Sequence, residues 1–174
     1  MTITDERVGR THAHNKSAFR RRRRRLSRQW SNMSDFNSQI IDEFHENDGT
    51  VSAMGFGRHL VVLHSTGAKS GADRVSPLLG LPDGAGGRFI IGSAAGSPKN
   101  PSWVYNLRKN PHVTVEWASD GSGIETHSAT ATELDPAARE QAWQAFTSMS
   151  SQFIEYTKTA QGRVFPIFRL TPTD

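Results

Sequence analysis

Two apolar segments separated by a short polar segment rich in glycine occupy the middle of the chain, between Leu60 and Leu81. The first apolar segment is the run 60–63, and the second contains Val75 and Leu78. Short apolar runs bounded by glycine and small polar residues are typical of β-strands, so the pattern predicts two strands joined by a loop. Strands joined by so short a connection pair antiparallel, which favours a fold of hairpin-connected strands.

The connecting loop, residues 65–74, combines a permissive backbone with groups that bind anions. Its glycines can adopt positive φ and let the backbone approach a ligand, and its hydroxyl and cationic side chains add donors. The residues concerned are Thr66, Gly67, Lys69, Ser70, Gly71 and Arg74. The loop suits a phosphate or a carboxylate, and we expect it to hold the anionic tail of a cofactor. The alternative is an ordinary hairpin loop with solvated charges.

The composition excludes several classes of protein. The chain contains no cysteine, which rules out disulfides, thiolate metal sites and a cysteine nucleophile. Its 174 residues are enough for one domain with a sizeable core. The first six residues lack the apolar core of a signal peptide, and no apolar run approaches the roughly 20 residues of a membrane span. We therefore expect a cytoplasmic protein.

Basic residues are concentrated at the start of the chain. Residues 1–30 contain ten Lys and Arg against two acidic residues, a net charge of +8, and six arginines are consecutive, Arg20 to Arg25. Because like charges repel, we expect residues 1–33 to be a disordered arm and residues 34–174 to be the folded domain. The arm suits an anionic membrane surface, at the inner face of the membrane. It has few aromatic residues to stack on bases, so no specific nucleic acid is expected. The alternative is a solvated tail without a partner.

The rest of the chain alternates helices with short strands. Capping residues followed by apolar positions at helical spacing predict three helices, which begin at Ser34 or Asn37, at Asn100-Pro101 and at Asp135-Pro136. The last is expected to continue to Tyr156. Further strands are expected at 88–93, 113–117, 124–134 and 164–170, with Pro166 at an edge or bulge. About six strands without βαβ alternation predict an α+β fold built on an antiparallel barrel.

Several catalytic motifs are absent from the sequence. The segment Gly67-Ala68-Lys69-Ser70 lacks the earlier glycine of a Walker loop. There is also no dinucleotide-binding fingerprint after a strand and no nucleophile elbow. Of the seven histidines only His12 and His14 are close in sequence, and both lie in the arm. No metal site is therefore expected.

Six short motifs follow one another in order from the loop onward. They are Thr66–Gly71, Arg74–Leu78, Ser93–Gly96, Lys99–Trp103, Asn106-Leu107 and Asn110-Pro111. Together they resemble the deazaflavin-dependent nitroreductase family, over roughly Phe36 to Leu170. The resemblance implies a split β-barrel of the FMN-binding type, in relatives usually a homodimer. It also implies binding of the 8-hydroxy-5-deazaflavin coenzyme F420, whose hydride passes to an organic acceptor.

The resemblance implies roles for individual residues. The coenzyme has a phosphate and a polyglutamate tail, which Lys69 and Arg74 would bind. Residues along the deazaflavin ring, at its polar edge and around the groove complete the implied set. By resemblance these contacts, with those of the loop, are Thr66, Gly67, Ser70, Gly71, Val75, Ser76, Pro77, Ser93, Trp103 and Asn106.

Three of these residues have an ordinary structural alternative. Trp103 lies at helical spacing from Leu107 and could belong to the core. Ser93 could be the end of a strand, and Arg74 could pair with Asp73 or with a helix carboxylate.

The sequence also departs from the family pattern. Relatives typically have basic residues where this chain has Ala68 and Ala94, so we expect weaker binding of the tail, or a different tail. Tyrosines that cover the ring in relatives correspond to Ser150, Phe153 and Tyr156. Only Tyr156 keeps a phenol, and it is the candidate catalytic residue, as proton donor or substrate hydrogen-bonding group.

The sequence thus favours an oxidoreductase that transfers a hydride from reduced F420 to a quinone or a nitro compound. The alternative is a binding or carrier protein for the deazaflavin or a flavin, without catalysis. FMN is the less favoured cofactor on the same fold.

Overall fold

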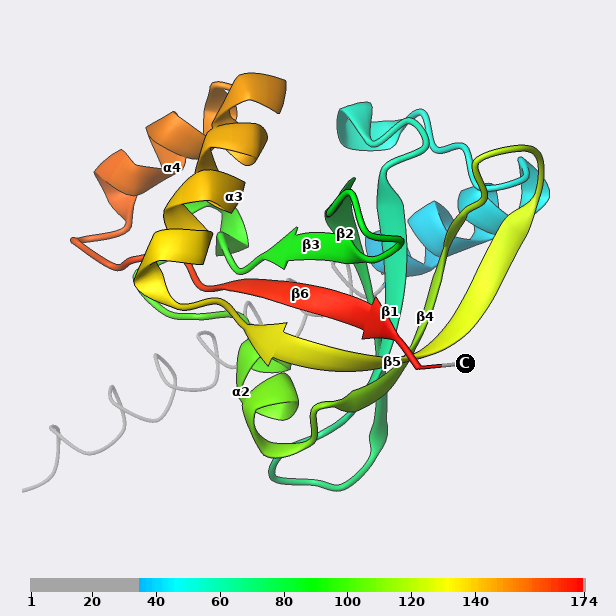
Figure 1. Cartoon of the computed structure of the whole chain (residues 1–174), viewed down its shortest axis with the longest axis horizontal. Helices are drawn as coiled ribbons and strands as arrows, with labels where there is room; N and C mark the ends of the chain where they lie inside the picture. The colour runs from blue at the N-terminus through cyan, green and yellow to red at the C-terminus, as the bar shows by residue number, and fades with distance from the viewer. Residues whose placement is uncertain (1–34, 174) are drawn as a thin grey trace, which may run out of the picture. The chain divides into compact units, whose positions relative to one another are not determined.

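The structure, a computed structural model, describes residues 35–173. Six strands within this range form a closed antiparallel barrel in the order β1-β2-β3-β6-β5-β4 (Figure 1). Their bounds are β1 (Leu60–Thr66), β2 (Asp73–Pro82), β3 (Arg88–Ile91), β4 (His112–Ala118), β5 (Ile124–Glu133) and β6 (Ile167–Pro172). The predicted six-stranded antiparallel barrel is therefore confirmed.

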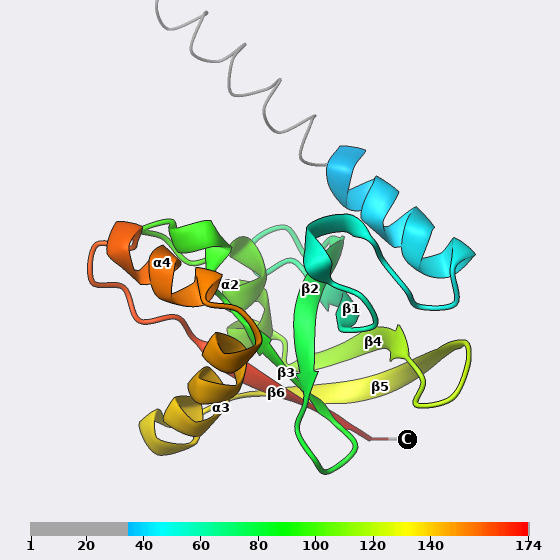
Figure 2. The same ribbon diagram turned by 90° about the horizontal axis from the view of Figure 1, so that it is seen from above.

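Four α-helices, one more than predicted, occur within residues 35–173. They are the helix 35–46, α2 (Ser102–Lys109), α3 (Pro136–Met149) and α4 (Gln152–Thr159). The extra helix arises because the last predicted helix is interrupted at Ser150, whose backbone is extended, with φ −151° and ψ 120°. The two halves, α3 and α4, lie in different directions (Figure 2). Two short 3₁₀ turns, η1 (Ala53–Gly55) and η2 (Ala94–Gly96), complete the helical elements.

The chain divides into two compact units, Met1–Gln39 and Ile40–Asp174. Of the first unit only residues 35–39, the start of a helix, are described. The predicted basic arm, 1–33, lies outside the described residues. No helix within residues 35–173 is both long and apolar enough to cross a membrane.

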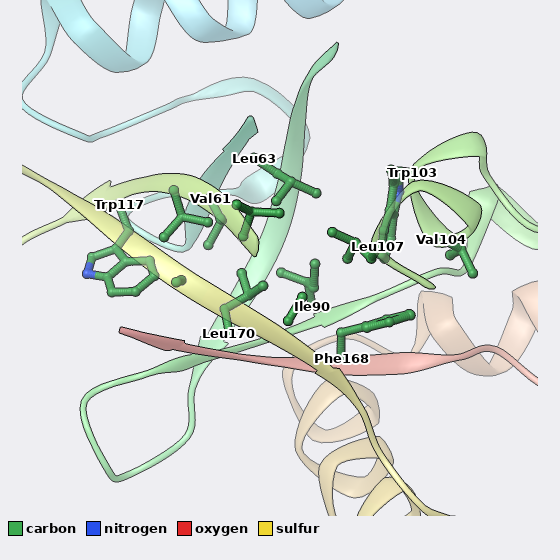
Figure 3. Close-up of a cluster of buried hydrophobic side chains, with 13 residues drawn as sticks. Val61, Leu63, Ile90, Trp103, Val104, Leu107, Trp117, Phe168 and Leu170 are labelled. Carbon is green, nitrogen blue, oxygen red and sulfur yellow. The ribbon is translucent and has the colours of Figure 1, made fainter. Parts of the chain in front are cut away.

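The barrel interior is a single apolar cluster to which helix α2 contributes. Inward-facing residues of the strands, such as Val61, Leu63 and Phe168, form one cluster with Trp103 and Leu107 of α2 (Figure 3). The rings of Trp103 and Phe168 form an edge-to-face pair with centroids 5.8 Å apart. Burial of each large apolar side chain is worth about 1.5–3 kcal/mol, so this cluster fixes α2 against the barrel.

Strand β1 is buried on both faces, which explains its continuous apolar run. Its odd-numbered residues face the barrel interior, whereas Leu60 and Val62 pack outside it against Ile40 and Phe44 of the first helix. A strand covered on both faces loses the usual alternation of apolar and polar residues. A third cluster, which includes Phe146, lies between β-strands and the helices α3 and α4.

Several predicted boundaries are wrong by a few residues. The first hairpin continues further than expected, because its last pair is Thr66 with Asp73, which leaves only residues 67–72 as its loop. Strand β3 ends at Ile91, and β6 begins at Ile167, so Pro166 precedes the strand and occupies no edge or bulge within it.

The two predicted helix starts in the second half of the chain had different outcomes. Asp135 caps α3 as predicted, because its carboxylate accepts hydrogen bonds from the N–H groups of Ala137 and Ala138. Asn100 does not cap α2. The N-cap position belongs to Pro101, and the Asn100 side chain accepts a hydrogen bond from Arg163 instead.

Candidate functional site

The loop between β1 and β2 is closed by its own hydrogen bonds. Gly67 N–H donates to the carbonyl of Ala72 and Gly71 N–H donates to the carbonyl of Gly67, both at 2.8 Å. Gly71 has φ +65°, and a Cβ on Gly67 would lie 2.5 Å from Ser70 Oγ. The left-handed backbone of Gly71 favours glycine at that position, and a side chain on Gly67 would displace the Ser70 hydroxyl.

Helix α2 supports the loop from one side. The Ala68 N–H donates to Asn106 Oδ1 at 2.9 Å, and Lys109 Nζ donates to the Ala68 carbonyl at 2.6 Å. Asn110 Nδ2 donates to the carbonyl of Thr66 at 3.3 Å. Asn106 is buried, with 6% of its surface exposed, so the structure places it beneath the loop, as a support for Ala68.

The two cations of the loop region remain available for a ligand. Lys69 and Arg74 are both exposed, and neither forms an ion pair with another of the residues that the structure describes. Arg74 Nη1 makes only a long hydrogen bond, 3.4 Å, to the backbone carbonyl of Asp73. The alternative in which Arg74 is neutralised by a carboxylate is therefore not what the structure shows.

A cleft of about 630 Å³ opens beside the base of this hairpin. Donor side chains predominate in its lining, with Asp73 as the acidic member. The lining residues are His64, Ser65, Thr66, Asp73, Arg74, Val75, His112, Val113, Thr114, Ser128, Ala129 and Thr173. Three of these, Thr66, Arg74 and Val75, are site residues predicted from the sequence. The sequence did not identify His64 or His112, which come together through the pairing of β1 with β4.

His64 is held at the cleft by Glu116 on the neighbouring strand. Glu116 Oε1 lies 2.6 Å from His64 Nε2, and its Oε2 lies 2.7 Å from His45 Nε2. Burial by itself raises the pKa of Glu116, but the hydrogen bonds to the two imidazoles outweigh it, and the pKa lies below its ordinary value of 4.5. At neutral pH the Glu116 carboxylate beside the cleft is therefore ionised, and both of its oxygens are hydrogen-bonded to histidines.

A second group of predicted residues lies around η2 and α4. Gly96, at φ +77°, packs so closely on α4 that a Cβ there would lie 2.7 Å from the carbonyl oxygen of Tyr156. Thr159 Oγ1 donates to the Gly96 carbonyl at 3.0 Å. The Tyr156 ring packs edge-to-face on Phe153, with centroids 6.0 Å apart. The turn that begins at Ser93 and the helix that carries Tyr156 are thus in direct contact.

The predicted residues therefore form two groups. In Figure 1 the β1–β2 connection lies at the lower end of the view, below α2, and α4 lies at the upper left. Ser76 and Pro77 are half-buried in β2, where they pair with Leu63 and Val62.

Trp103 differs from its predicted role as a wall of the groove. Only 5% of its surface is exposed, and it belongs to the barrel core (Figure 3). The structure favours the core alternative for this residue.

The closed antiparallel barrel with inserted helices and a cationic hairpin loop defines a split-barrel protein of the flavin- and deazaflavin-binding class. The family model described as F420H(2)-dependent quinone reductase matches residues 38–172. The chain therefore belongs to the F420H2-dependent quinone reductase family. The deazaflavin-dependent family, the enzyme class and the coenzyme predicted from the sequence motifs are confirmed by this membership.

Individual relatives agree with the family model. An F420H(2)-dependent quinone reductase of Mycobacterium tuberculosis (strain H37Rv) is 28% identical over 113 residues, which cover 64% of this chain and 72% of the relative. The solved structure of an F420-H2 dependent reductase (FDR-A) matches with a TM-score of 0.54 and 34% identity, over 65% of this chain and 94% of that one. A structure described as a domain-swapped dimer matches with a TM-score of 0.56 and 29% identity, over 80% and 98%.

Proposed function

We propose that this protein transfers a hydride from reduced F420 to a quinone. The family and the M. tuberculosis relative are named for that reaction. The observation that carries the proposal is the pair of exposed cations, Lys69 and Arg74, at a hairpin loop held by its own backbone and by α2. A rigid cationic loop of this kind fits the anionic end of the deazaflavin coenzyme.

The donors around the loop suit the phosphate and the acidic tail. Lys69 and Arg74 would bind the charges, and the hydroxyls of Thr66 and Ser70 would add neutral donors. Because the loop is hydrogen-bonded before any ligand arrives, little conformational entropy is lost on binding. The adjoining cleft, lined by His64 and other donors, extends the same surface for the acidic chain.

The ring end of the site would be at Ser93 and Tyr156. The coenzyme is long, with its ring and its tail at opposite ends, and the two groups of predicted residues are likewise separated. When bound, the coenzyme supplies the hydride, and with it both electrons of the reduction. The Tyr156 hydroxyl forms no hydrogen bond within residues 35–173, so it can donate one to a quinone oxygen and deliver the proton that completes the hydroquinone.

Titration with oxidised F420, followed by the coenzyme's own fluorescence, tests the binding part of the proposal. We expect saturable binding, weakened at least tenfold, about 1.4 kcal/mol, in a Lys69→Ala, Arg74→Ala double variant. The control is an Arg108→Ala, Arg169→Ala double variant, which removes two exposed arginines that are each paired with a carboxylate. Equal affinity in both double variants would remove the loop from the binding site. Binding of FMN without F420 would contradict the coenzyme assignment.

Anaerobic turnover with reduced F420 tests the reaction. We expect a water-soluble quinone to be reduced, with kcat lowered about 10²-fold in Tyr156→Phe at unchanged coenzyme affinity. A nitroaromatic is the second acceptor to assay, because Ser150 and Phe153 stand where relatives have tyrosines. Tight binding of F420 without turnover on any acceptor would instead support the carrier alternative.

The proposal also includes the oligomeric state of the protein. One structurally similar protein is described as a domain-swapped dimer, and we expect a homodimer here too. Sedimentation equilibrium would show a mass near twice 19.2 kDa.

A further inference from the structure

Arg163, between α4 and β6, uses its side chain to bind a single turn elsewhere in the chain. Nε donates to the Ser97 carbonyl at 2.8 Å, and Nη2 donates to the Ser93 carbonyl at 2.6 Å. Nη1 donates both to the Gly92 carbonyl and to Asn100 Oδ1, each at 2.7 Å. Charge-assisted hydrogen bonds of this length are among the strong ones in proteins. The guanidinium therefore joins the residues before the turn to those after it.

The turn held in this way has an unfavourable backbone. Ala94 and Ala95 are both left-handed, with φ of +47° and +49°, and they are consecutive non-glycine residues. The left-handed conformation is unfavourable for residues other than glycine, so the surrounding structure must impose it. The four hydrogen bonds of Arg163 bracket these two alanines and are the contacts best placed to do so.

Arg163 is itself fixed in position. It is half-buried, and its guanidinium lies over the ring of Phe165, with Cζ 4.7 Å from the ring centroid. Its backbone N–H donates to the Ala160 carbonyl at 3.0 Å, which closes the turn after α4. The same segment that ends the helix of Tyr156 thus carries the side chain that shapes the turn of Ser93.

The hydroxyl of Ser93 is left available by this arrangement. The backbone carbonyl of Ser93 is used by Arg163, whereas its side chain forms no hydrogen bond within the described part of the chain. On the far side of the turn, Gly96 contacts the backbone of Tyr156. The turn therefore determines how the two polar groups of the ring end are placed relative to each other.

We propose that Arg163 is a positioning residue for hydride transfer: it holds the turn 93–97 so that Ser93 and Tyr156 present their hydroxyls to the ring end of the coenzyme and to the acceptor. This inference rests on the proposed function, because it assigns the ring end to these two residues. The tail is bound at the distant hairpin loop, so Arg163 acts on the chemical step and leaves coenzyme affinity nearly unchanged.

The test compares Arg163→Lys with a matched control, Arg139→Lys. Arg139 is also half-buried, donates from Nε to the Phe165 carbonyl at 2.8 Å and lies over the ring of Trp143, but it does not touch the turn. A lysine ammonium cannot bind carbonyls on both sides of the turn in the fork geometry of arginine. We expect kcat to fall about 10–100-fold in Arg163→Lys, because small displacements of reacting groups cost this much. Coenzyme Kd should stay within threefold, and Arg139→Lys should keep both values.

Two further experiments support or contradict the proposal. Asn100→Ala removes one guanidinium acceptor with little loss of packing, and a several-fold fall in kcat at unchanged Kd would support the proposal even if Arg163→Lys does not fold. Added guanidinium should restore part of the turnover of Arg163→Ala. Unchanged kcat in folded Arg163→Lys, or an equal fall in Arg139→Lys, would overturn the proposal. Failure of the unmodified protein to bind F420 would instead contradict the proposed function.

Discussion

Glu116 is the residue whose protonation connects stability to pH most directly. Its two carboxylate oxygens are shared between His45 and His64, and only 15% of its side-chain surface is exposed. Because these hydrogen bonds hold its pKa below 4.5, the folded state favours the ionised carboxylate more than the unfolded chain does. The resulting stabilisation is present above the unfolded pKa and is lost as pH falls through the folded pKa.

We expect Glu116→Gln to lower the free energy of unfolding by about 1–3 kcal/mol at pH 7, because two hydrogen bonds to a charged acceptor are lost. As pH falls through the lowered pKa of Glu116 in the folded protein, the difference from the unmodified protein should shrink, since the native carboxylate then becomes protonated as well. Urea denaturation at pH 7 and at a series of lower pH values measures this change. Glu125→Gln is the control, because Glu125 is half exposed and its contact with His127 is long, 3.3 Å. A difference that does not change with pH would contradict the assignment.

Asn106 links the stability of the loop to ligand binding. It accepts from the Ala68 N–H, so Asn106→Ala leaves that donor without its partner and removes a buried amide. We expect a loss of about 1–3 kcal/mol in unfolding free energy and weaker F420 binding. Ser102→Ala, an exposed change on the same helix, should alter neither quantity. Retained affinity in Asn106→Ala would show that the loop keeps its shape without this support.

For individual residues, the sequence indicated the exposed cations and glycines of the loop, but not the side chains that form hydrogen bonds with distant parts of the chain. Lys69, Arg74 and the loop glycines could be proposed as site residues because their chemistry is local and their spacing is short. The carboxylate that holds His64 lies 52 positions later in the chain, and only the antiparallel pairing of β1 with β4 brings the two together. Arg163 was missed for the same reason, since its acceptors lie about 63–71 positions away.

Among the contacts between elements, the one between η2 and α4 can be tested directly by substitution. Gly96 has φ +77°, and a Cβ would press on the backbone of Tyr156 and the side chain of Thr159. Gly84 has nearly the same φ, +79°, but nothing lies within 4 Å of its Cβ position. Comparing alanine at the two positions therefore separates the cost of the backbone conformation from the cost of the contact.

We expect Gly84→Ala to cost about 1–2 kcal/mol, the penalty for a left-handed alanine. Gly96→Ala should cost about 1–3 kcal/mol more, because α4 must move away from the turn. Denaturant unfolding of both variants measures the difference. Equal costs would show that α4 is not closely packed on η2. Turnover should fall in Gly96→Ala alone, since only this change displaces Tyr156.

The ends of helices were predicted correctly where neighbouring residues determine them, and less well where contacts with distant residues determine them. The Asp135 cap was correct because capping involves neighbouring residues. Asn100-Pro101 gave an equally good local signal, yet Arg163 competes for the Asn100 side chain and the helix begins without it. The break at Ser150 follows from the need to place Phe146 and Phe153 in one cluster from two directions, which no local pattern encodes.

At the scale of the whole molecule, strand number, hairpin order and the antiparallel barrel could be predicted, whereas the particular strand pairs that close the barrel could not. Closure depends on the pairs β1–β4 and β3–β6, which join strands distant in sequence. The pairing of β1 with β4 also forms much of the cleft beside the loop. The strand pairing therefore creates part of the candidate site. The sequence could indicate only the part formed by the β1–β2 hairpin.

The basic arm allows one prediction about the complete chain. Six consecutive arginines, Arg20 to Arg25, within a segment of net charge +8 should bind anionic lipid, at about 1 kcal/mol per basic residue near the surface. Such binding would bring the domain to membrane-dissolved quinones. We expect the full chain to sediment with vesicles containing phosphatidylglycerol, less so as salt rises, and not with neutral phosphatidylcholine vesicles.

The matched variant replaces the six arginines by serine in the full-length chain. It should lose vesicle binding while its kcat on a water-soluble quinone stays the same, because the proposed coenzyme contacts all lie between Thr66 and Tyr156. With a long-chain quinone in anionic vesicles, its turnover should fall severalfold. Equal sedimentation of both proteins would leave the arm without a role at lipid. A loss of turnover on the soluble quinone would mean that the arm takes part in the reaction itself and does more than place the enzyme at its acceptor.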